Sequence, residues 1–213
     1  RGFVCLCPDH LAAGERLDPR GEPYDTAPFY VRHPDWSAVG KAIWDGARAL
    51  DILQSLEVVD GSRLGVAGHS LGGHGSLFLA AMDERVKAAV CNCGLTLFAE
   101  NPKRLAWSRD SWYRYFPRLR PLFLANTGLP FDLHEIAALI APRAFLNISA
   151  LADEGFAGNE LLGEAGIELN KVWQLHGEGD RFGWFMFGGP HSVPHAARQL
   201  AAAWLEQWLQ PGQ

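Results

Sequence analysis

The sequence predicts an α/β fold in which a mostly parallel sheet is covered by helices on both faces. Short apolar runs of strand length alternate with longer helical patterns, which is typical of parallel strands joined by helical crossovers. The chain has 213 residues, 48% of them hydrophobic, and this suffices for one sizeable core. No repeat, low-complexity tract or linker divides it. Residues 1–213 are therefore predicted to form a single domain.

Five apolar runs are predicted to be strands. They lie at residues 3–7, 64–67, 86–93 and 144–148 and within 171–176. The first run ends at a Pro-Asp pair, and an Asp-Gly turn at 60–61 precedes the second. With helices between them, these runs favour parallel pairing over hairpins.

Helical patterns fill most of the intervals between the strands. They cover residues 37–56, 73–82 and 136–140 and fall within 157–166 and 194–209. The last helix is amphipathic, and its Leu200, Trp204 and Trp208 are predicted to face the core. Residues 95–130 are irregular and rich in aromatic side chains, so we expect a small aromatic cap there.

Charge and hydropathy exclude two classes of partner. The formal net charge is -5, the pI is near 5.9, and Lys and Arg are scattered. Such a chain lacks the basic field that binds phosphate backbones, so no nucleic-acid partner is predicted. No apolar stretch reaches the roughly 18 residues of a spanning helix, so no membrane partner is predicted either.

The four cysteines form two C-x-C pairs, Cys5/Cys7 and Cys91/Cys93, each inside a predicted strand. Alternation along a strand would place both sulfurs of a pair on one face, which would allow a four-thiolate zinc site. Structural zinc sites usually draw their ligands from turns with wider spacing, however. We therefore favour reduced cysteines in the core, predict no metal, and expect a reducing compartment such as the cytoplasm.

The segment Gly68-His69-Ser70-Leu71-Gly72 fits the pattern G-x-S-x-G between a predicted strand and a predicted helix. On such a sharp turn a serine is held in a strained conformation above the carboxyl end of the sheet, beside a helix N-terminus. The flanking glycines leave room for the chain to cross itself. Ser70 is therefore the candidate nucleophile.

A serine hydroxyl becomes a good nucleophile only when a base takes its proton, and the base needs a third group to orient it. On this kind of fold the acid and then the histidine follow the serine along the chain, each after a later strand. Asp153 lies shortly after the strand predicted at 144–148. Glu154 is adjacent and stays as the alternative acid.

Three histidines follow the acid: His176, His191 and His195. His176 closes a predicted strand, and His195 falls in the first turn of the last helix. His191 lies in a loop with nearby glycines that allow close approach to the elbow, so it is the preferred base. His69 and His74 flank the serine too closely for the usual base geometry, and we interpret both as pocket lining.

Five ordered segments of the chain resemble successive blocks of the α/β-hydrolases. They are PDHLAAGER, HPDWSAVGKAIWDGARALDIL, GVAGHSLGGHGSLFLAAMDERVKAAV, FDLHEIAALIAPRAFLNISALADEGF and GGPHSVPHAARQLAAAWLEQWL. The most similar branch holds dienelactone-hydrolase-like and acetyl-xylan-esterase-like serine esterases. The resemblance implies that Ser70 is the nucleophile, Asp153 the acid and His191 the base, and that the Leu71 N–H is one oxyanion-hole donor.

The resemblance also implies a function. The chain would be a serine carboxylic-ester hydrolase that acts through an acyl-enzyme on small-molecule esters, acetyl or carbohydrate esters among them, without a metal or organic cofactor. His69, Trp107 and Trp112 are the candidate substrate-binding residues. The cap aromatics either bind a sugar or aryl group or pack the cap onto the core.

Three rival functions stay open. A serine peptidase of the same superfamily would use the same triad. A dienelactone hydrolase in the strict sense would carry a cysteine nucleophile, which Ser70 argues against. A catalytically silent scaffold that binds a ligand or partner has no need of Ser70, Asp153 and His191 together.

The chain departs from the branch at its start. Members begin with further strands, and the loop after their third strand carries the second oxyanion-hole N–H. Residues 3–7 resemble the fourth strand. We therefore expect either a fragment of a longer hydrolase, or a sheet that a second copy of the chain, a partner segment or a rearranged loop completes.

Overall fold

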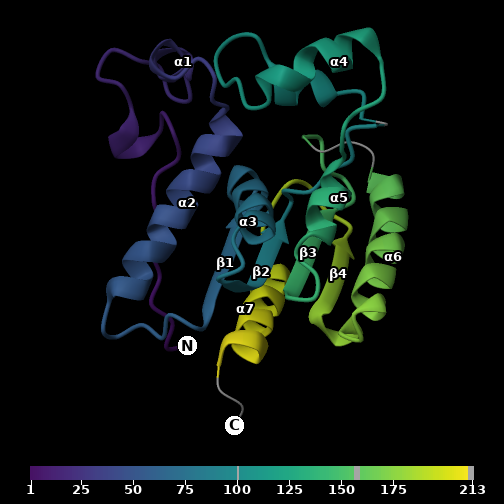
Figure 1. Cartoon of the computed structure of the whole chain (residues 1–213). Helices are drawn as coiled ribbons and strands as arrows, with labels where there is room; N and C mark the ends of the chain where they lie inside the picture. Colours follow the sequence, from purple (N-terminus) through teal and green to yellow (C-terminus); the bar gives the residue numbers. More distant parts are fainter. Residues whose placement is uncertain (100, 156–158, 211–213) are drawn as a thin grey trace.

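The computed structural model describes residues 1–99, 101–155 and 159–210. These residues contain a four-stranded, fully parallel sheet with strand order β1-β2-β3-β4 (Figure 1). The strands are β1 (Leu64–His69), β2 (Val86–Asn92), β3 (Ala144–Ala150) and β4 (Phe182–Phe187). All four carboxyl ends therefore meet at one edge of the sheet. The predicted α/β fold is confirmed.

Helices cover both faces of this sheet. On one face α3 (Leu71–Met82) packs against β1 and β2, and α2 (Ala38–Ser55) packs against α3. The same face carries α5 (Leu133–Ala138) and α6 (Asn159–Leu175). The other face is covered by α7 (His195–Leu209), which contacts β1, β2 and β3.

The core is divided by the sheet. The larger cluster lies on the side of α3, α5 and α6, where Leu77, Phe145 and Trp173 are fully buried. A smaller cluster lies under α7 and includes Ile148 and Ala197. Every residue of β3 is buried, as is every residue of β2 except Lys87, and such burial is what a strand covered on both faces requires.

The described residues also form several short helices. They are α1 (Ala27–Arg32), α4 (Arg120–Ala125) and the 3₁₀ helices η1 (Gly14–Arg16), η2 (Arg104–Ser108), η3 (Pro117–Leu119) and η4 (Gly179–Arg181). In Figure 1, α1 and α4 lie at the same end of the molecule. Phe98, Tyr115, Phe116 and Phe123 are buried in the larger core cluster. Most aromatics of the predicted cap therefore pack the cap onto the core.

Tyr30 ties the cap to the rest of the fold. Its hydroxyl donates to the Arg114 carbonyl over 2.6 Å and accepts from the Ala38 N–H over 3.0 Å. Tyr30 is 8% exposed. One buried hydroxyl thus joins α1, the start of α2 and the cap.

The predicted strand at residues 3–7 is wrong. This segment is extended and lines a groove of about 380 Å³ with β1, but within the described chain β1 forms a ladder only with β2. Phe3, Val4 and Leu6 are exposed. Cys5 and Cys7 are exposed as well, so the prediction of core cysteines fails for this pair. Strand propensity produces a strand only where another strand supplies hydrogen bonds.

The strand predicted within residues 171–176 is also wrong, because residues 171–175 form the C-terminal end of α6 and His176 lies in the turn that follows. Leu162, Ala165, Leu169 and Trp173 are buried at spacings of three and four, which is a helical period. The strand lies instead at β4. Residues 157 and 158 of the helix predicted within 157–166 are outside the described residues. The helices predicted at 37–56, 73–82 and within 194–209 are confirmed. None of the described helices is long and apolar enough to cross a membrane.

Candidate active site

The serine predicted as nucleophile occupies a strained turn between β1 and α3. Ser70 has φ 57° and ψ -120°, and a positive φ is uncommon for a residue with a side chain. Its N–H donates to the Asn92 carbonyl over 2.9 Å. A Cβ on Gly68 would lie 2.1 Å from the Gly72 oxygen, so the chain can cross itself here only with glycine at position 68. This is the geometry of a nucleophile elbow.

The acid and the base predicted from the sequence are hydrogen-bonded to each other. His191 Nδ1 lies 2.7 Å from Asp153 Oδ2. The Asp153 side chain is 2% exposed and that of His191 is 30% exposed. A carboxylate only accepts hydrogen bonds, so Nδ1 carries the hydrogen and Nε2 is the basic nitrogen. Glu154, the alternative acid, is exposed.

Main-chain contacts hold the loops that carry this pair. The Leu151 N–H donates to the Phe187 carbonyl over 2.8 Å, and the Ala152 N–H donates to the Gly189 carbonyl over 3.0 Å. The Gly155 N–H donates to the second oxygen of Asp153. The ammonium of Lys103, from the cap, donates to the carbonyl of Glu154. The loops after β3 and β4 are thus joined directly.

His69 links the base to the elbow. Its ring centroid lies 4.6 Å from that of His191, and its Nδ1 lies 2.6 Å from Asn92 Oδ1. Because Ser70 follows His69 in the chain, the imidazole of His191 lies beside the elbow. The structure therefore brings Ser70, Asp153 and His191 to one edge of the sheet.

Leu71 is the first residue of α3. The first N–H groups of a helix have no acceptor within it, and they carry the positive end of the helix dipole. The Leu71 N–H is therefore one of the amides at the elbow that can receive a developing negative charge.

Other predicted site residues lie elsewhere. His74 is fully buried against Phe78 and Trp107, so its assignment as pocket lining is wrong. Burial lowers the pKa of His74 to about 3. The side chain turns into the core because position 74 lies one helical turn after Ser70, on the face of α3 that meets the cap.

The two candidate substrate-binding tryptophans differ in their surroundings. Trp107 is partly buried and packs against His74 and Phe98. Trp112 is 48% exposed; its ring contacts Tyr24, and its indole N–H donates to the Pro23 carbonyl over 2.8 Å. Trp112 thus packs against the N-terminal segment.

Sequence reasoning missed one residue of this site, Cys93. Within the described residues, Cys93, Asp153 and His191 form a group whose potential metal-ligand atoms all lie within 4.8 Å of one another. Cys93 directly follows β2, as Ser70 directly follows β1. This position at the carboxyl end of a strand could have identified Cys93 from the sequence. The four sulfurs of the chain do not gather into a site of their own in the part that the structure describes.

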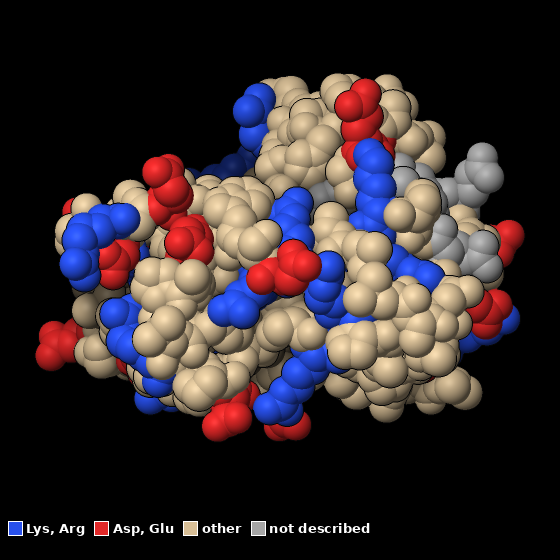
Figure 2. Space-filling view, turned by 90° about the horizontal axis from the view of Figure 1, so that it is seen from above, with Lys and Arg blue, Asp and Glu red and all other residues tan. Residues whose placement is uncertain are grey.

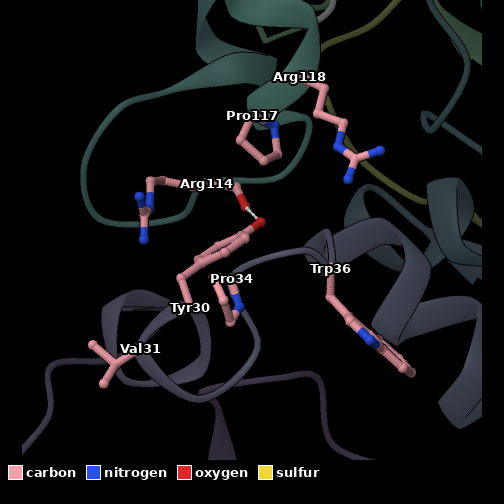
Figure 3. Close-up of a pocket in the computed structure, with 7 residues that line it drawn as sticks. All are labelled: Tyr30, Val31, Pro34, Trp36, Arg114, Pro117 and Arg118. Carbon is pink, nitrogen blue, oxygen red and sulfur yellow. Dashed lines mark hydrogen bonds between the residues drawn. The ribbon is translucent and has the colours of Figure 1, made fainter.

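A separate pocket of about 390 Å³ lies between α1 and the cap (Figure 3). Tyr30 lies at its centre, between Pro34 of the segment after α1 and Pro117 of the cap. Neither Ser70 nor the Asp153–His191 pair lines this pocket. Viewed from above, the end of the molecule that carries the cap has basic and acidic side chains interspersed on it (Figure 2).

Comparison with known proteins gives a consistent picture. The family model for acetyl xylan esterase matches residues 40–99, which include the elbow. The hydrolase-like protein YtaP of Bacillus subtilis (strain 168) is 28% identical over 208 residues, which are 98% of this chain and 66% of that protein. The 4-O-methyl-glucuronoyl methylesterase of Podospora anserina is 28% identical over 89% of this chain and 43% of its own length.

Solved structures share the fold. A glucuronoyl esterase from Solibacter usitatus matches with a TM-score of 0.69 at 24% identity, over 82% of this chain and 50% of that one. A promiscuous esterase of carbohydrate esterase family 15, from a marine bacterial metagenome, matches with a TM-score of 0.71 at 22% identity. This match covers 85% of this chain and 53% of that one. The chain thus spans between about two fifths and two thirds of the lengths of the proteins it matches.

The sheet order, the elbow and the matched structures together define the α/β-hydrolase fold. In sequence and fold the chain resembles the serine-esterase branch that includes acetyl-xylan-esterase-like and glucuronoyl-esterase-like proteins. The resemblance inferred from its sequence is confirmed.

Proposed function

We propose that the chain carries the catalytic triad of a serine carboxylic-ester hydrolase, with Ser70 as nucleophile, His191 as base and Asp153 as acid. The observation that carries this proposal is the hydrogen bond between His191 Nδ1 and the buried Asp153 carboxylate beside the elbow. This bond fixes the tautomer in which Nε2 accepts a proton.

The reaction follows from these positions. Ser70 Oγ attacks the ester carbonyl while His191 Nε2 takes its proton, and Asp153 stabilises the imidazolium. The Leu71 N–H and the N-terminus of α3 stabilise the oxyanion. The alcohol leaves with the proton from His191, and an acyl group stays on Ser70. Water, deprotonated by the same imidazole, then releases the acid. None of these steps needs a metal or an organic cofactor.

The names of the relatives suggest two substrate classes. An acetyl xylan esterase removes acetate from a sugar hydroxyl, so the sugar is the alcohol. A glucuronoyl methylesterase removes methanol from a uronate, so the sugar is the acyl group. We propose carbohydrate esters as the substrate class, with His69 and Trp107 as the substrate-binding residues nearest the elbow. Trp112 stays a candidate only for an extended substrate, because its ring packs against Tyr24 and its indole N–H donates to Pro23.

The first test is covalent labelling of Ser70. The chain and its Ser70→Ala variant are treated with a fluorophosphonate, and intact mass is measured. We expect one adduct on the chain and none on the variant. Absence of an adduct on both would contradict the proposal for this chain and favour a silent scaffold.

The second test separates the substrate classes. The chain is incubated with an acetylated xylo-oligosaccharide and, separately, with the methyl ester of 4-O-methyl-glucuronate. Acetate release from the first would identify a sugar-alcohol esterase, and methanol release from the second a uronate esterase. Ser70→Ala is the control for both. Release of neither product by a chain that is labelled would contradict the carbohydrate assignment alone.

A further inference from the structure

Cys93 is the residue that follows β2, and an unusual backbone conformation sets the direction of its side chain. Its φ is 45°, although it is not glycine. Its N–H donates to the Ile148 carbonyl of the neighbouring strand over 2.8 Å. The left-handed conformation breaks the alternation of the strand. Cys91, inside the regular strand, packs in the larger core cluster, whereas Cys93 turns toward the loops that carry Asp153 and His191.

The thiol of Cys93 contacts both of these loops. Its Sγ lies 3.7 Å from the carbonyl oxygen of Ser192, the residue after His191, and donates its hydrogen there. The Asp153 carboxylate also interacts with the thiol, within the group whose atoms lie 4.8 Å or less apart. Cys93 is 2% exposed, so water does not compete for these contacts.

We propose that Cys93 is a positioning residue for the Asp153–His191 pair. The inference rests on the function proposed above. The thiol holds the carbonyl that follows the base and packs beside the carboxylate, so it fixes the distance between the two loops. Without it, the imidazole would keep its chemical identity but lose part of its orientation toward Ser70.

The environment of the thiol excludes a nucleophilic role for it. Burial raises the pKa of Cys93, and the nearby Asp153 carboxylate adds to this effect because a thiolate would be repelled there. A protonated, enclosed thiol is a weak nucleophile and a hydrogen-bond donor. Cys93 contacts Asp153, whose carboxylate binds Nδ1 of the imidazole, whereas the proton transfer proposed above uses Nε2.

The test compares Cys93→Ala and Cys93→Ser with a matched control, Cys91→Ala. Both cysteines are buried near the end of β2, but only Cys93 contacts the two loops. The first readout is the rate constant of fluorophosphonate labelling at Ser70. We expect Cys93→Ala to slow labelling by about 10- to 100-fold, because small misplacements of a catalytic group cost that much. Cys93→Ser, which keeps a donor, and Cys91→Ala are expected to retain most of the rate.

The second readout does not depend on any reaction. The Nδ1 proton between an imidazole and a carboxylate gives a strongly downfield proton NMR signal, which His191→Gln identifies by its loss. We expect this signal to broaden or shift in Cys93→Ala and to persist in Cys91→Ala. Because the signal reads the pair directly, it tests the inference even if labelling shows the proposed function to be wrong.

Three outcomes would overturn the inference. An unchanged signal and rate in Cys93→Ala would show that the thiol does not orient the pair. Equal losses in Cys93→Ala and Cys91→Ala would show a general packing effect. If Cys93→Ala does not fold, Cys93→Ser carries the test, and loss of the signal in a folded Cys93→Ser would contradict the idea that a donor at this position suffices.

Discussion

His191 Nδ1 lies 2.7 Å from Asp153 Oδ2, although 38 residues separate the two in the chain. Each residue lies in a loop that follows a strand, and β3 and β4 are neighbours in the sheet. The carboxylate is almost fully enclosed, while the imidazole keeps access to the surface. A buried acid that orients a partly exposed base is the arrangement that the proposed mechanism requires.

We first predict that Asp153→Asn slows labelling of Ser70 by about 10³- to 10⁴-fold, because an amide can favour the wrong imidazole tautomer. The control is Glu154→Gln, which changes the adjacent, exposed carboxylate and should keep the rate within about twofold, as expected for a surface substitution. Labelling rate constants check both. If Glu154→Gln slowed labelling more than Asp153→Asn, Glu154 would be the acid.

We next predict that Gly68→Ala disrupts the elbow. The new methyl group would lie 2.1 Å from the Gly72 oxygen, so the start of α3 has to move. We expect labelling to be lost and the free energy of unfolding to fall by about 1–3 kcal/mol, as for other overpacked sites.

The matched control for that change is Gly75→Ala, also in α3, where an added Cβ meets nothing within 4 Å. Alanine is the better helix former by up to about 1 kcal/mol, so this variant should be as stable as the parent chain or more so. Urea unfolding measures both variants. Normal labelling of Gly68→Ala would contradict the crossing of the chain at this turn.

A pH effect follows from His74. Its pKa is about 3 in the folded chain, whereas an unfolded histidine has about 6.5. Between these values the unfolded chain binds a proton that the folded chain does not. Above a pH of about 6.5 this group therefore does not affect the free energy of unfolding. At lower pH the free energy of unfolding decreases by about 1.4 kcal/mol per pH unit.

His74→Leu should remove this effect. Between about pH 7.5 and about pH 5.5, we expect the loss of unfolding free energy to be smaller than in the parent chain by about 1.4 kcal/mol. The control is His176→Gln, because His176 is exposed, and it should lose stability as the parent chain does. Equal losses in His74→Leu and the parent chain would mean that His74 is not buried as a neutral ring.

We finally predict that Tyr30→Phe loosens the cap. The variant leaves the Ala38 N–H and the Arg114 carbonyl without the hydroxyl that joins them. Removing the hydrogen-bond partner of a buried group costs about 1–3 kcal/mol, and because the bond to Arg114 is only partly buried we expect a total loss in that range by urea unfolding. Tyr24→Phe, at an exposed tyrosine, should change stability by less than about 0.5 kcal/mol. Equal effects would contradict the role of the Tyr30 hydroxyl.

The sequence by itself determined the elements that depend on consecutive residues. The elbow can be predicted because Gly68, Ser70 and Gly72 have the spacing G-x-S-x-G between a predicted strand and a predicted helix. The long helices are readable because their apolar residues keep a period near 3.6. The order of Ser70, Asp153 and the later histidines is likewise a property of the chain, and the position of His191 in a glycine-containing loop favoured it over His195 in the helix that follows.

Only the tertiary structure decided what depends on neighbours in space. Residues 3–7 have strand propensity but no strand beside them in the described chain, and residues 171–176 extend a helix whose buried stripe ends at Trp173. The positive φ of Cys93 cannot be read from a C-x-C pattern, so its contact with the Asp153–His191 pair was not foreseen. His74 was predicted to line the pocket but is buried in the core. Its burial is set by the cap that folds over it and not by the residues next to it in the sequence.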